Sequence, residues 1–206
     1  MSDTPIDVFI DLPSFPGPVQ AGRLWSHFRK GRESASFEYN KEWLANPHRF
    51  ALEPLLPLTD GTFHTNPGQS VFGAIGDSTP DRWGRILMRR AELARARTAN
   101  ESPHTLSELD YLLRVNDEAR QGALRFSQDG GQSFCAPPGS TPIPPLVNLS
   151  RLLHAADHFC RDDENAEDLR LLLAPGSSLG GARPKASVKD KKGNLCIAKF
   201  PRYDDE

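Results

Sequence analysis

The sequence has few cysteines and no long apolar segment. Its three cysteines, Cys135, Cys160 and Cys196, are widely spaced and form no C-x-x-C pair, so we expect reduced thiols and neither a disulfide framework nor a metal site. No stretch reaches the roughly 18 apolar residues that span a bilayer, and the first residues lack a basic segment followed by an apolar run. These absences predict a soluble, cytoplasmic protein with no membrane partner.

The sequence also lacks an excess of charge of either sign. With 25 Lys and Arg against 27 Asp and Glu, the net charge is -2, so the overall balance predicts no nucleic-acid partner. Arginine is locally abundant within one expected helix, at Arg82, Arg85, Arg89, Arg90, Arg95 and Arg97. A solvated helix face and a contact with DNA phosphates or an acidic partner are both open for this stretch.

The amino-terminal part shows the patterns of strands and of two helices. Apolar alternation and turn residues predict three strand-forming segments, which are 6–11, a hairpin over 22–39, and 122–127. Capping residues followed by apolar residues at helical spacing predict helices over 80–98 and 105–116. The first of these helices starts with a hydroxyl cap, a proline and an acid, Ser78-Thr79-Pro80-Asp81.

A proline-rich stretch, residues 136–145, marks the clearest boundary in the chain. It holds five prolines, one glycine and no charge, a composition that favours an extended linker. We therefore expect an amino-terminal subdomain over 1–135 and a second part over 146–206. In the second part, the spacing of apolar residues predicts two helices, the second of which Pro175-Gly176 stops, followed by a hairpin of two strands.

The segment between the last helix and this hairpin is rich in glycine. Residues 175–185 hold three glycines, two serines and two cations, which are the parts of a phosphate-binding loop. A plain surface turn has the same composition, so both interpretations stay open on composition alone. The spacing fits neither a Walker A loop, because Ala182 follows Gly181, nor a G-x-G-x-x-G fingerprint.

The order of the elements favours a kinase-like site. Protein kinases cover the nucleotide phosphates with a glycine-rich loop and bring a lysine from a following strand. Lys199 lies at the corresponding place. The period of a strand puts Ile197 on the same face as Lys199, where it would form an apolar wall of the pocket. The predicted fold class is α+β: short antiparallel strands with two helices, then a helical pair and a hairpin like that of a kinase N-lobe.

The sequence resembles the HipA-type serine/threonine kinases. The run from Ser177 to Ala186, followed by Ile197-Ala198-Lys199-Phe200-Pro201, looks like the nucleotide loop and ATP lysine of that family. Four earlier segments are similar to its amino-terminal subdomain: 36–39, 57–58, 76–85 and 122–126. The resemblance implies a bacterial toxin–antitoxin kinase that uses ATP and Mg²⁺ to phosphorylate a serine on a protein such as an aminoacyl-tRNA synthetase.

The resemblance also implies roles for individual residues. The phosphates would be held by Gly180, Gly181, Ala182, Arg183, Pro184 and Lys185, with Lys199 paired to them. Ser178 would be the loop serine that family members autophosphorylate, and a phosphate of about -2 charge there would repel ATP. The implied partner is a HipB-like DNA-binding antitoxin, so DNA would be contacted only indirectly.

No catalytic aspartate motif of a kinase follows the loop in this sequence. It contains neither an H-x-D-x-x-x-x-N loop nor a D-F-G, so we predict no catalytic residue in this chain and place the Mg²⁺ ligands outside it. Two hypotheses remain open. The chain is either the ATP-binding portion of a longer HipA-like kinase, inactive alone, or a non-catalytic regulatory domain that docks on a separate kinase or antitoxin.

Overall fold

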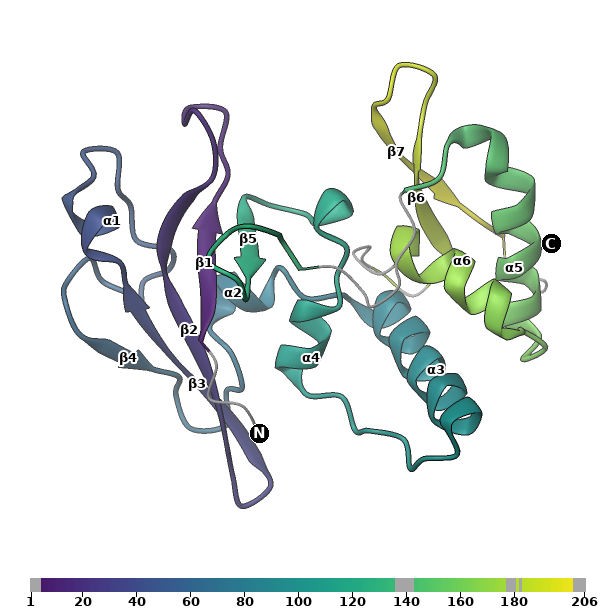
Figure 1. Cartoon of the computed structure of the whole chain (residues 1–206), viewed down its shortest axis with the longest axis horizontal. Coiled ribbons are helices and arrows are strands. Elements are labelled where there is room, and N and C mark those ends of the chain that lie inside the picture. The colour runs from purple at the N-terminus through teal and green to yellow at the C-terminus, as the bar shows by residue number, and fades with distance from the viewer. Residues whose placement is uncertain (1–4, 136–142, 177–180, 182, 202–206) are drawn as a thin grey trace. The chain divides into compact units, whose positions relative to one another are not determined.

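The computed structural model describes residues 5–135, 143–176, 181 and 183–201 (Figure 1). The chain forms two compact units. The first contains residues 1–79, 107–112 and 121–135, and the second contains residues 80–106, 113–120 and 136–206. Each unit buries its own set of apolar side chains.

The first unit is built on a five-stranded antiparallel sheet with the strand order β4-β3-β2-β1-β5. Its strands are β1 (Ile6–Ile10), β2 (Val19–Arg29), β3 (Arg32–Tyr39), β4 (Thr62–His64) and β5 (Leu124–Ser127). The hairpin of β2 and β3 turns at Lys30 and Gly31, whose φ values of 49° and 75° are those of a tight reversal that matches the strand twist. This hairpin was predicted, and the structure confirms it.

Strand β1 is more buried than its alternating sequence predicts. All five residues are buried, because β1 lies between β2 and β5 and because its acidic residue Asp7 has partners. The Asp7 carboxylate accepts hydrogen bonds from Gln20 Nε2 at 2.6 Å and from Arg23 Nε at 2.9 Å. The carboxylate is therefore satisfied at the sheet surface without facing open solvent.

Three short helices belong wholly or mostly to this unit: α1 (Lys41–Ala45), α2 (Gly73–Gly76) and α4 (Glu108–Leu113). The start of α4 is fixed by a residue far away in sequence, since Glu33 of β3 accepts the backbone N–H groups of Glu108 and Leu109. Ser107 adds a local cap with Asp110. The helix is thus shorter than the predicted 105–116, and its cap lies two residues later than expected.

The second unit packs three helices and a two-stranded hairpin around one apolar core. Its elements are α3 (Arg82–Ala99), η1 (Asp117–Ala119), η2 (Leu146–Asn148), α5 (Leu149–Cys160), α6 (Ala166–Gly176), β6 (Lys185–Lys189) and β7 (Leu195–Lys199). Helix α6 contacts α3, α5 and β6, so it lies at the centre of the unit. The largest core side chains include Trp83, Leu87, Phe159 and Leu172.

Two local predictions in this unit need correction. Helix α3 is capped by Asp81, whose side chain accepts the Arg82 N–H, and not by the hydroxyls of Ser78 or Thr79. Helix α6 continues through Pro175 and Gly176, which were expected to stop it. Proline lacks the N–H of the helical hydrogen bond, and its ring crowds the carbonyl group one turn earlier. Because α6 ends directly after Pro175, only its last turn bears that cost.

The two compact units also divide the chain differently from the expected subdomains 1–135 and 146–206. Helix α3 belongs to the second unit, because its buried face packs on α6 and on the core around Leu172. Most of the proline-rich stretch lies outside the described residues. The predicted α+β class is confirmed, although β2 is longer than the short strands expected.

Candidate functional site

The glycine-rich segment joins α6 to β6 within the second unit. The described part of it consists of Gly181, Arg183 and Pro184, whereas the predicted residues Ser178, Gly180 and Ala182 lie outside the described residues. Gly181 has a φ of +79°, a left-handed conformation that glycine adopts without strain. Pro184 is buried, and its carbonyl accepts the N–H of Phe200, which fastens the loop to the end of β7.

The two lysines of the predicted site lie directly opposite each other. In the antiparallel pair of β6 and β7, Lys185 is paired with Lys199, and Ser187 is paired with Ile197. Opposed residues of an antiparallel pair share a face, so these four side chains lie on one side of the hairpin. The other side carries Ala186 and Val188, which are fully buried in the core.

The ammonium of Lys185 lies against the loop. A Cβ added at Gly181 would be only 2.7 Å from Lys185 Nζ, so the absence of a side chain there makes room for the charge. Burial and the neighbouring Lys199 ammonium lower the pKa of Lys185, while the Asp81 carboxylate acts in the opposite direction. Two cations and a glycine backbone therefore meet at the end of the hairpin.

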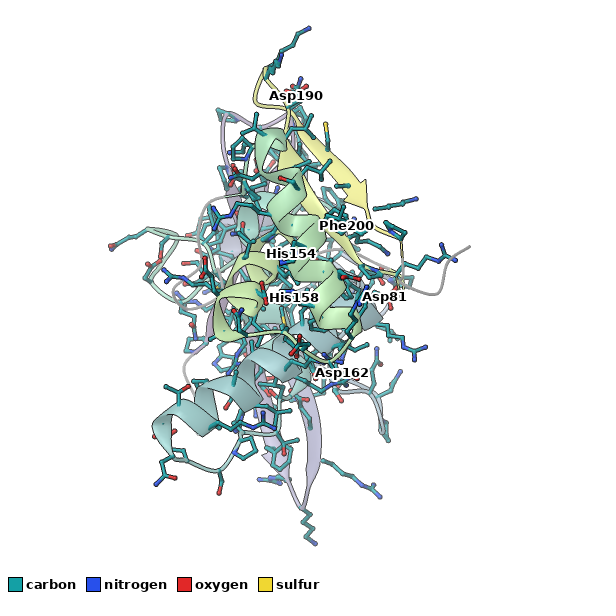
Figure 2. All side chains as sticks on the ribbon, turned by 90° about the vertical axis from the view of Figure 1, so that its right-hand side faces the viewer. Asp81, His154, His158, Asp162, Asp190 and Phe200 are labelled. Atoms are coloured by element: carbon teal, nitrogen blue, oxygen red, sulfur yellow. The ribbon has the colours of Figure 1, made fainter. Side chains whose placement is uncertain are left out.

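Asp81, at the start of α3, completes the cluster. Its Oδ2 accepts the backbone N–H of Gly181 at 2.5 Å, and its Oδ1 accepts the N–H of Arg82 at 2.6 Å. These two backbone hydrogen bonds lower the pKa of the Asp81 carboxyl. Figure 2 shows Asp81 by the end of the hairpin opposite to Asp190, which marks the turn.

Trp83 holds the same loop by its backbone and its side chain. The backbone N–H of Trp83 donates to the carbonyl of Gly181 at 3.0 Å, and its indole Nε1 donates to the carbonyl of Lys185 at 2.8 Å. From the sequence, Asp81 is predicted only as part of a helix start, and no role in the site is predicted for Trp83. The only signal of their role was their place in a segment similar to the HipA-type kinases.

The remaining described residues of the predicted site are exposed to solvent. Ile197 is 54% exposed on the same face as Lys199, and Arg183 is exposed beside the loop. Lys199 itself is exposed. The cluster is therefore an open cationic surface at the end of a hairpin, which suits an extended anion better than an enclosed apolar ligand.

Two hollows lie elsewhere on the units. One, of about 730 Å³, is lined by residues including Pro145, Arg151 and Leu171, and the other, of about 770 Å³, lies on the first unit beside Arg23 and Tyr39. Neither includes Lys185 or Lys199. Both are open and are lined by charges of both signs, such as Arg170 with Glu167 and Arg23 with Glu38, and neither includes the glycine-rich loop. We therefore take the cluster of Lys185, Lys199 and Gly181 as the candidate site.

The arginines of α3 are partly committed to ion pairs. Arg90 binds Glu164 at 2.8 Å, pairs with Asp162 and stacks 4.0 Å from the centre of the Phe159 ring, while Arg95 binds Glu92 at 2.8 Å. These contacts stabilise the second unit. The helix face is thus not a continuous row of unpaired cations, which weakens the interpretation as a DNA-contacting stripe.

The described residues include neither a metal-ligand cluster nor a membrane-spanning helix. No group of three or more His, Cys, Asp or Glu side chains is placed there to hold a metal ion. None of the described helices is long and apolar enough to cross a membrane.

The amino-terminal residues match a known protein family. Residues 17–127, more than half of the chain, match the HipA N-terminal domain. The chain belongs to the HipA N-terminal domain family. The matched range of this HipA-type chain runs from just before β2 to the end of β5 and includes α3 with Asp81 and Trp83. It ends before the glycine loop and the two lysines, and a comparison with curated proteins finds no match.

Proposed function

We propose that this chain is the nucleotide-binding, amino-terminal part of a HipA-like serine/threonine protein kinase, in which Lys185 and Lys199 bind the phosphates of ATP. The observation that carries the proposal is the pairing of the two lysines beside Gly181. Like charges directly opposite each other destabilise a sheet, so their pairing has a cost that a bound anion would relieve. A triphosphate supplies that anion, and family membership makes ATP the expected source.

The described residues fit ATP and do not by themselves fit Mg²⁺. The ammonium groups of Lys185 and Lys199 and the loop N–H groups are donors for phosphoryl oxygens. Asp81 is the only carboxylate described at the cluster, and it is engaged by two backbone N–H groups. We therefore assign no metal ligand to this chain and derive no step through a metal.

Other functional assignments follow from the resemblance alone. They are a role in a toxin–antitoxin module, a HipB-like DNA-binding antitoxin as partner, a protein substrate such as an aminoacyl-tRNA synthetase, and Ser178 as an autophosphorylation site. In this proposal the loop residues Gly180 and Ala182 and the flanking Arg183 and Pro184 shape the phosphate site. Ile197 supplies an apolar wall next to Lys199.

Calorimetric titration of ATP into the purified chain tests the proposal. We expect saturable binding that weakens by about tenfold or more in Lys185→Ala and Lys199→Ala, because each loses a charged donor to phosphate. Lys192→Ala is the matched control, since this lysine lies in the β6–β7 turn at the far end of the hairpin.

A different result would favour the other hypothesis. If the wild type and all three variants bound ATP equally, or none bound it saturably, the lysine pair would not be a nucleotide site. The chain would then be better explained as a non-catalytic regulatory domain that docks on a kinase or an antitoxin.

A further inference from the structure

One carboxylate occupies a backbone donor of the candidate site. The Asp81 side chain accepts the N–H groups of Gly181 and Arg82, and Lys185 acts on it electrostatically. Backbone N–H groups of a glycine loop together with a lysine ammonium are the donors that phosphoryl oxygens use. In the described structure, an internal anion is thus placed where a ligand anion is expected.

We propose that Asp81 is a built-in competitor for the phosphate site, whose carboxylate must leave the Gly181 N–H before a phosphoryl group can bind there. The proposal rests on the proposed function, since it assumes that the cluster takes the phosphates of a nucleotide. It adds a residue from the start of α3, 100 positions away from Gly181 in sequence, to the determinants of nucleotide affinity.

A phosphoryl group and the Asp81 carboxylate cannot share the Gly181 N–H, because both are anions. A phosphoryl oxygen bound to the Gly181 N–H would come within a few ångströms of the Asp81 oxygen that already accepts this proton. Two anions at that distance repel strongly unless a cation lies between them, and a single N–H cannot serve both well. Each therefore excludes the other from this donor.

The structure lets Asp81 leave without releasing the loop. Asp81 is exposed, so its side chain can rotate into solvent. The two hydrogen bonds from Trp83, to the carbonyls of Gly181 and Lys185, do not involve the carboxylate. The loop would stay attached to α3 while the Gly181 N–H became accessible to a ligand.

The experiment compares anion affinity in Asp81→Asn, Asp81→Ser and the wild type. Both substitutions remove the charge, and both keep a side-chain oxygen that can cap α3, so folding is preserved. The probes are ATP and inorganic tripolyphosphate, titrated at low salt by calorimetry. We expect both variants to bind each probe about five- to tenfold more tightly than the wild type.

Asp190→Asn is the matched control for net charge. Asp190 lies in the same unit at the β6–β7 turn, where it accepts the N–H groups of Lys192 and Asn194. Its variant should bind both probes within about twofold of the wild type, because Asp190 lies at the opposite end of the hairpin from Lys185 and Lys199. In Asp81→Asn/Lys185→Ala, the gain in affinity should disappear.

A second measurement follows the Asp81–Gly181 contact by NMR, first without any ligand and then with tripolyphosphate. The amide proton of Gly181 in the wild type should shift when Asp81 is titrated with acid, and this titration should be absent in Asp81→Ser. Tripolyphosphate should then perturb the Gly181 amide at lower concentration in Asp81→Ser than in the wild type.

The outcomes separate this inference from the proposed function. If the wild type binds ATP through Lys199 and the Asp81 variants bind no more tightly, the proposed function holds and the competition is wrong. Weaker binding in these variants also overturns it and makes Asp81 a positioning residue. If only the Asp81 variants bind, and Lys185 is required, the competition is supported. Absence of binding in every variant overturns both.

Discussion

The indole Nε1 of Trp83 donates a hydrogen bond to the carbonyl oxygen of Lys185 at 2.8 Å, although 102 residues separate the two. Trp83 is 2% exposed, and its ring lies edge-on to Phe159 with ring centres 5.0 Å apart. The bond is made to the first residue of β6, the strand that carries one of the two site lysines. The start of α3 therefore positions the proposed nucleotide site from within the core of the second unit.

Replacing Trp83 with Phe should weaken both the fold and the site. Trp83→Phe keeps an aromatic ring but leaves the Lys185 carbonyl without its indole donor, which costs about 1–3 kcal/mol of unfolding free energy. Urea denaturation measures this loss, and ATP titration should show weaker binding because Lys185 is less firmly held. Phe159→Leu is the control, since it disturbs the ring contact and leaves the hydrogen bond. Equal ATP affinity in all three proteins would contradict the link between Trp83 and the site.

Gly181 should be replaceable only at a cost to the site. In Gly181→Ala, the left-handed backbone costs about 1–2 kcal/mol, and the new Cβ would push Lys185 Nζ out of its place 2.7 Å away. Gly193→Ala is a close control, because Gly193 has a φ of +84° but open space around it. Denaturation should show similar losses of stability for both, whereas ATP affinity should fall only in Gly181→Ala. A parallel loss of affinity in Gly193→Ala would assign the effect to general destabilisation.

Local sequence patterns predicted most elements of both units, but not the residues that tie distant segments together. The hairpin turning at Gly31, strand β5 and helix α5 follow from turn residues and apolar spacing, which act over a few positions. The cap of α4 by Glu33 could not be predicted in this way, because it depends on β3 lying beside that helix. The grouping of α3 with the second unit depends likewise on tertiary packing.

The candidate site was likewise predictable from local sequence patterns only in part. The shared face of Ile197 and Lys199 follows from the period of a strand, and the register of the hairpin adds Lys185 to that face. The contact of Asp81 with Gly181 joins two segments whose spacing in sequence carries no signal. The residues around Asp81 indicate only an ordinary helix start. The contact of its side chain with the glycine-rich loop is visible only in the folded chain.

Glu92 should make the second unit sensitive to acid. This carboxylate is 3% exposed and accepts hydrogen bonds from Arg95, Arg114 and the N–H of His104. The bonds from Arg95 contribute most to lowering the pKa of Glu92 to about 2 from 4.5. Because the folded pKa is the lower one, the stabilisation is complete above 4.5 and is lost as pH falls towards 2.

Glu92→Gln should therefore lose about 2–3 kcal/mol of unfolding free energy at neutral pH. The difference between this variant and the wild type, measured by urea denaturation, should shrink as pH falls below 4.5. Glu101→Gln is the control, because Glu101 binds the same Arg95 from an exposed position and should cost no more than about 0.5 kcal/mol. A difference between Glu92→Gln and wild type that is constant with pH would refute the assignment.

The opposite dependence is expected from His158 on α5. Its Nδ1 lies 2.9 Å from Oδ2 of Asp168 on α6, and this hydrogen bond is the main cause of the raised pKa of His158. Asp157 and Asp163 raise it further, and the His154 ring lies 4.1 Å from the His158 ring. Since the folded pKa is the higher one, the pair stabilises the unit fully below 6.5 and the stabilisation is lost as pH rises through the raised value.

Thermal denaturation from about pH 5.5 to about pH 8.5 tests the His158–Asp168 pair. The melting temperature of the wild type should fall with rising pH relative to that of His158→Asn, which lacks the titrating ring. His64→Asn, on β4 of the first unit, is the control and should keep the pH dependence of the wild type. If His158→Asn and the wild type gave parallel curves across this range, the ion pair would not link α5 to α6 in solution. The start of α6 would then be held by the Asn165 side chain, whose Oδ1 accepts the backbone N–H groups of Glu167 and Asp168.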